Sequence, residues 1–135
     1  MKGRCTIANE LTLNATLHYE DSNFVEAVHQ VVDRLQSVST KKVVRHSQTI
    51  GVTEEAVVLG EVTAPGWALF INRDTVNYID LKVATGGAIF ARLKPDTLAN
   101  GTGGFAFLEL GSGAQAPFAI ANTAACLMDY LIVSS

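Results

Sequence analysis

Regular alternation of apolar and polar residues, interrupted by turn signals about every ten residues, most constrains how this chain can fold. The clearest run is 11–19, where leucine, alanine and tyrosine alternate with threonine, asparagine and histidine. Shorter runs recur at 89–93, 105–108 and 126–133, and glycine-rich or proline-containing segments separate them. This pattern predicts an all-β protein, an antiparallel β-sandwich or jelly-roll-like fold.

Two of these runs, 105–110 and 127–133, are apolar on both faces of the expected strand. Such strands are central to a sandwich or are covered by a neighbouring subunit. A mean hydropathy of +0.24 fits apolar area shared between subunits.

The segment Ala64-Pro65-Gly66-Trp67 predicts a type II turn. Proline presets φ at the first central position, and glycine supplies the positive φ of the second. Trp67 then opens an apolar strand, and we expect its side chain to be buried in the core.

One segment fits two structures. Phe24, Val28, Val31, Val32 and Leu35 recur at the spacing of an amphipathic helix over 23–35. The same segment is rich in β-branched valine, which favours extended structure. The sequence leaves a short helix and a strand open here.

The 135 residues fit one domain of ordinary size. We assign residues 1–10 to an N-terminal arm or edge strand, and 11–135 to a single β-sandwich domain. The arm carries Lys2 and Arg4, and it could add a strand to a partner protein.

The net charge of −3 argues against a nucleic-acid surface, which is usually basic. The one basic cluster, Lys41, Lys42, Arg45 and His46, is expected to contact an acidic stretch of a partner protein. No apolar run is long enough for a membrane helix. The sequence therefore predicts neither a nucleic-acid nor a membrane partner.

No group of residues forms a recognisable catalytic or metal-binding motif. Asp74, Asn77 and Asp80 offer oxygen ligands, but Asx-type turns explain this region more simply. Cys5 and Cys126 are expected to be free, mostly buried thiols. We expect no enzymatic activity, no cofactor and no metal.

Two stretches resemble small virion structural proteins of tailed bacteriophages: EEAVVLGEVTAPGWALFINRDTVNYIDLKVATGG and APFAIANTAACLMDYLIV. The resemblance covers roughly residues 47–133 and rests on short matching stretches of sequence, not on a catalytic signature. It implies a β-sandwich assembly protein, made in the host cytoplasm and located in the virion.

Two function classes follow. The first is a capsid decoration or cement protein, expected as a homotrimer that contacts the major capsid protein and its sister subunits. The second is a tail- or fibre-associated receptor- or carbohydrate-binding module, which would use Trp67 and Tyr78 to stack on sugars. A third possibility, a connector or tail component, would act through the same kind of protein–protein contact as the first class.

Overall fold

The computed structural model describes residues 10–20, 22, 26–37, 42–98, 103–110 and 116–134. The contacts divide the chain into two compact units, Met1–Thr40 and Lys41–Ser135. One domain is expected over residues 11–135, whereas these contacts group the first strands separately from the rest. The described residues form strands, turns and irregular segments. They include no helix that is long and apolar enough to cross a membrane.

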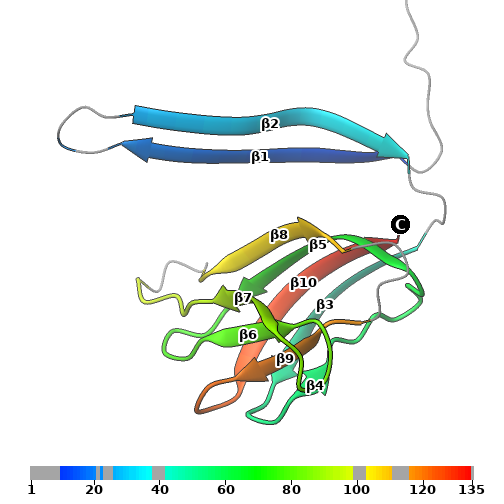
Figure 1. Ribbon diagram of the computed structural model, residues 1–135, viewed down its shortest axis with the longest axis vertical. Helices are drawn as coiled ribbons and strands as arrows, with labels where there is room; N and C mark the ends of the chain where they lie inside the picture. Colours follow the sequence, from blue (N-terminus) through cyan, green and yellow to red (C-terminus); the bar gives the residue numbers. More distant parts are fainter. Residues whose placement is uncertain are drawn as a thin grey trace, which may run out of the picture. The chain divides into compact units, whose positions relative to one another are not determined.

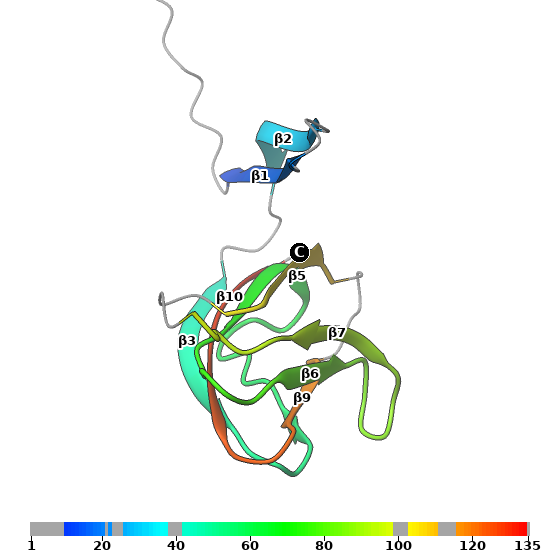
Figure 2. The ribbon, with the colours of Figure 1, turned by 90° about the vertical axis from the view of Figure 1, so that its left-hand side faces the viewer.

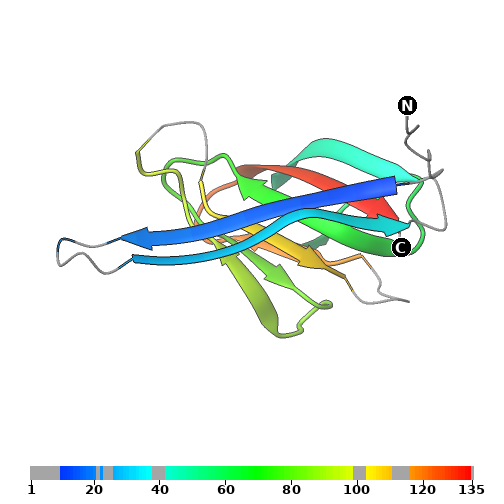
Figure 3. The ribbon, with the colours of Figure 1, turned by 90° about the horizontal axis from the view of Figure 1, so that it is seen from above.

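The first unit contains an antiparallel hairpin of β1 (Glu10–Glu20) and β2 (Glu26–Ser37), whose strands run side by side in Figure 3. The expected strand over 11–19 is confirmed. The segment 23–35, open between helix and strand, is extended from residue 26 onward. Its valines pair across the hairpin, Val31 with Ala15 and Val28 with His18. Because this segment is extended, it pairs with β1 as the second strand of the hairpin.

The second unit is a sandwich of two four-stranded sheets, and every pairing in them is antiparallel. Figures 1 and 2 show the two layers, with β3 and β10 on one side and β6 and β9 on the other. The first sheet has the order β3 (Val43–Ile50), β10 (Cys126–Ser134), β5 (Pro65–Asn72), β8 (Phe105–Glu109). The second has the order β4 (Glu55–Ala56), β9 (Phe118–Ala121), β6 (Ile79–Lys82), β7 (Ile89–Leu93).

The hydrophobic core lies between these sheets. Phe70, Met128 and Ile132 from the first sheet and Leu81 and Leu93 from the second have no exposed surface. Full burial of such a side chain contributes about 1.5–3 kcal/mol. The predicted all-β antiparallel sandwich is confirmed.

The predicted type II turn at Pro65-Gly66 is wrong. Both residues are buried in β5, and Gly66 is not among the positive-φ glycines. The turn lies earlier, where Val62 N donates to Leu59 O at 3.0 Å around Gly60, which has a φ of 58°. Pro65 begins β5 beside a register shift, a position where a strand tolerates the missing N–H.

Trp67 is also placed differently from the expectation of a buried core side chain. Its side chain is half-buried on the outward face of β5, with its ring centroid 5.4 Å from that of Phe107. The alternation along β5 explains this, because Ala68, Phe70 and Asn72 take the inward positions.

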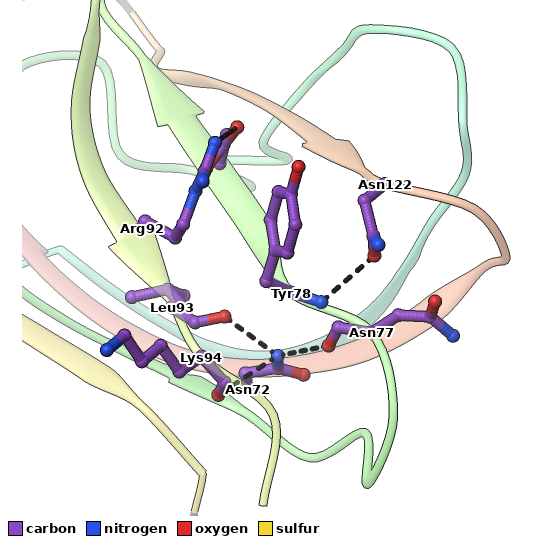
Figure 4. Close-up of polar contacts among 8 residues, drawn as sticks. Asn72, Asn77, Tyr78, Arg92, Leu93, Lys94 and Asn122 are labelled. Atoms are coloured by element: carbon purple, nitrogen blue, oxygen red, sulfur yellow. Dashed lines mark hydrogen bonds and ion pairs between the residues drawn. The ribbon is translucent and has the colours of Figure 1, made fainter.

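A buried polar residue, Asn72, ties the sheets together at the end of β5. Its amide nitrogen donates to the main-chain carbonyls of Asn77, Leu93 and Lys94 at 2.8, 2.9 and 3.3 Å (Figure 4). Its side-chain oxygen accepts from Asp74 N at 2.9 Å, which is an Asx turn. The predicted Asx-type turn is confirmed.

Two glycines allow the chain before β8 to approach this centre. Gly103 N donates to Asn72 O at 3.0 Å, and Gly104 N donates to Lys94 O at 2.7 Å. A Cβ at either position would overlap backbone atoms of Asn72 or Lys94. The glycines at the end of the 100–104 segment, expected as a turn, therefore have a packing role.

Candidate docking surface

The outward face of the sheet β3-β10-β5-β8 is unusually apolar. Alternation along β10 points Met128, Tyr130 and Ile132 into the core and leaves Leu127 and Leu131 outside. We call the outward side chains of this sheet the apolar face. Its apolar members are Val43, Trp67, Leu69, Ile71, Phe105, Phe107, Leu127, Leu131 and Val133.

Several of these side chains are strongly exposed. Phe105 is 64% exposed, Leu127 45%, Leu131 38% and Phe107 36%. Of the two strands expected to be central or covered by a neighbour, β10 is central, since it lies between β3 and β5, whereas β8 is at the edge of the sheet. Large contiguous apolar surfaces on a soluble domain mark interaction sites.

A groove of about 660 Å³ hollows this face over β3, β10 and β5. Its walls combine apolar side chains with charged and polar groups. The lining residues are Arg45, His46, Ser47, Leu69, Ile71, Arg73, Asp129, Tyr130 and Leu131.

Asp129 is the polar centre of the groove. It accepts from the Ser47 hydroxyl and from Arg73 Nε, the latter at 2.6 Å. The Ser47 hydroxyl first, and then the Arg73 guanidinium, hold the pKa of Asp129 below its usual range. The carboxylate is thus charged at neutral pH and already hydrogen-bonded on both oxygens.

The outward face of the other sheet is different, because it carries ion pairs. Arg92 binds both carboxylate oxygens of Asp80, at 2.7 and 2.9 Å, and its guanidinium carbon lies 4.0 Å from the Tyr78 ring centroid (Figure 4). The hydrogen bond with Asp80 raises the pKa of Arg92. Lys82 pairs with Glu54, and this contact and the Gly86 amide lower the pKa of Glu54. This face suits contact with water.

A smaller groove of about 280 Å³ lies on the polar side. It contains Tyr78 and Asp80 beside Asn122, whose side chain accepts from Tyr78 N at 3.0 Å (Figure 4). The Asp80 carboxylate and the Asn122 side-chain oxygen are therefore engaged within the domain.

Of the described members of the predicted basic cluster, Lys42 lies apart from Arg45 and His46. Lys42 forms an exposed ion pair with Glu61 at 3.3 Å, a contact of little energetic value. Arg45 and His46 are consecutive in β3 and so lie on opposite faces. Both nevertheless line the groove, where the His46 ring meets the Tyr130 ring edge-on at 6.0 Å. Lys2, Arg4 and Lys41 fall outside the described residues.

Sequence reasoning missed two groove residues, Arg73 and Asp129. They are 56 positions apart, and only the pairing of β10 with β5 brings them together. The available signal was a single Asp within the apolar run of residues 126–133. A lone charge in an otherwise apolar strand indicates a specific partner, though it does not identify the partner.

The described residues contain no group of three side chains able to hold a metal ion. Asp74, considered above as a ligand, accepts instead from the amides of Val76 and Asn77. The Asn77 amide is the main reason that the pKa of Asp74 is lowered.

Comparison with family models, with curated proteins and with solved structures found no match for this chain.

Proposed function

We propose that this chain is a structural protein of a phage virion that acts by protein–protein contact, most concretely as a capsid decoration protein. The observation that carries the proposal is the contrast between the two outer faces of one sandwich. One face bears two ion pairs, Asp80–Arg92 and Glu54–Lys82, with Ile89 exposed in its edge strand β7. The other bears one ion pair, Arg73–Asp129, among exposed phenylalanine and leucine. A domain with one apolar face is suited to docking on that face.

Docking requires no reactive group. A standard interface buries about 800 Å² per partner, and its centre is apolar with aromatic anchors. The pair Trp67–Phe107 supplies such anchors. Many copies on a closed shell convert modest individual affinities into a large collective stabilisation.

The proposal is tested with particles assembled with and without this protein. Heads that carry it are expected to survive higher temperature and chelator concentration than heads that lack it. A Leu131→Asp variant, which places a charge in the apolar face, should fail to protect them. The matched control is Lys94→Glu, which changes an exposed residue directly after β7 in the other sheet. This variant should protect the heads as well as the unmodified protein does.

The receptor-binding alternative predicts the opposite pattern. Particles without the protein would be as resistant as complete ones but would not adsorb to cells. The two aromatic residues considered for sugar stacking lie apart, because Trp67 is on the apolar face and Tyr78 stacks with Arg92 on the other sheet. A single sugar site using both is thus not favoured.

A further inference from the structure

Strand β8 is an edge of the sandwich that lacks the usual protection against pairing with another chain. Among the described residues its one neighbouring strand is β5, and the two pair without a register shift (Figure 1). The first four residues of β8 are uncharged and apolar, and Phe105 and Phe107 in it are 64% and 36% exposed. Edge strands normally avoid further pairing by carrying a basic residue, a proline or a bulge, or by being very short.

The other three edges of the two sheets each have such a feature. Strand β3 presents the exposed Arg45 and follows Lys42. Strand β4 has only two residues, and β7 contains Arg92 and pairs with β6 through a register shift. The β8 edge is therefore the one at which pairing with a further strand is least opposed.

The main-chain groups of β8 indicate what kind of partner fits its edge. Asn72 N donates to Gly104 O at 3.0 Å and Leu110 N donates to Gly66 O at 2.7 Å, so residues 106 and 108 between them face β5. The N–H and C=O groups of residues 105 and 107 consequently point away from β5. These groups bind no other residue that the structure describes. Donors and acceptors at this spacing match the backbone of an extended strand.

A second copy of β8 matches this pattern. A two-fold axis at Ala106, perpendicular to the sheet, pairs the two strands antiparallel and sets Phe105 of each copy opposite Phe107 of the other. Each such pair exchanges both of its main-chain hydrogen bonds and places two aromatic rings side by side on the outward face. Glu109 lies beyond the paired residues and takes no part.

We propose that two copies of this chain join their β8 edges in this antiparallel arrangement, so that two four-stranded sheets become one continuous sheet. Strand β8, which is apolar on both faces, then becomes internal. Because the axis is perpendicular to the sheet, the apolar faces of both copies turn to the same side. The inference goes beyond the proposed function, since it names a sister subunit as the partner of the β8 edge, as a pair and not the expected trimer.

Sedimentation of the full chain over a micromolar concentration range tests this pairing, and reversible dimers are expected. Phe107→Ala and Phe107→Pro both remove the ring, but only proline also removes the outward N–H, which an edge strand tolerates. Phe107→Pro should therefore associate about tenfold or more weakly than Phe107→Ala. Val43→Pro, an exposed position at the start of the other edge strand β3, is the control and should dimerise like the unmodified protein. Circular dichroism checks that each variant keeps its strands.

A cross-link tests the register without a proline. The two Ala106 residues face each other in a non-hydrogen-bonded pair, whose Cα atoms are about 4.5 Å apart, within reach of a disulfide. The variant C5S/A106C should therefore form a covalent dimer when treated with oxidised glutathione. The control C5S/L108C should not, because its cysteines would lie about 14 Å apart along the strands.

Three results would overturn the inference. The unmodified protein could remain monomeric throughout, or Phe107→Pro could keep its strands and associate as well as Phe107→Ala. The cysteine at position 106 could fail to cross-link, or could cross-link no better than the one at 108. Because no particle is present, these results are independent of the particle-protection test of the proposed function.

Discussion

The buried side chain of Asn72 donates a hydrogen bond of 2.9 Å to the main-chain carbonyl of Leu93, so the end of β5 in one sheet is joined to the end of β7 in the other. The same amide group also serves Asn77 and Lys94. One side chain thus satisfies several buried carbonyls where the two sheets meet.

Replacing Asn72 with alanine should lower the free energy of unfolding by about 2–4 kcal/mol, because buried carbonyls lose their donor. Urea unfolding measures this change. Asn122→Ala is the matched control: Asn122 is exposed and accepts one bond from Tyr78 N, so its loss should cost less than about 1 kcal/mol. Equal costs for the two variants would contradict the role given to Asn72.

Phe70 and Trp67 share β5 but face opposite ways. Phe70 is fully buried, so Phe70→Ala should cost roughly 3–5 kcal/mol. Trp67→Ala should cost only about 1–2 kcal/mol, since part of the side chain already faces solvent. The Trp67 variant should instead reduce the protection of heads, because it removes an aromatic side chain from the apolar face. If it were as destabilising as Phe70→Ala, the outward placement would be wrong.

Acid should weaken the fold partly through Asp129. Its pKa is lower in the folded chain than the usual 3.8, so its contribution is complete above the unfolded pKa and is lost as pH falls through the lower folded value. As the pH falls from about 5 through this lowered pKa, Asp129→Asn should therefore lose less stability than the unmodified protein. Ser47→Ala should have the same effect in smaller measure. Identical pH profiles for all three proteins would rule out this contribution.

The Cys126 thiol should resist modification in the folded protein. It is 1% exposed, and burial raises its pKa to about 11. Because the thiolate is the reactive form, a Cys5→Ser variant should react with a thiol reagent at pH 8 only after urea unfolding. Rapid reaction of the native variant would show that the strand β10 opens readily.

The sequence was sufficient for the fold class because alternation and turn spacing are local signals. The strand at 11–19 and the two-faced runs at 105–110 and 127–133 are examples. Sequence reasoning failed where geometry depends on distant pairing. Pro65-Gly66 has turn chemistry, yet pairing with β10 draws it into a strand, and the outward position of Trp67 depends on the same register. The groove around Asp129 is formed by three strands that are far apart in the sequence, so local patterns do not predict it.

A cryo-electron microscopy map of intact particles that carry this protein tests the capsid-decoration role most directly. The account predicts sandwich-shaped density on the head, with the face of Phe107 and Leu131 buried against protein and the face of Arg92 and Lys82 open to solvent. Density confined to the tail, or a head-bound domain with the Phe107 face in solvent, would contradict it.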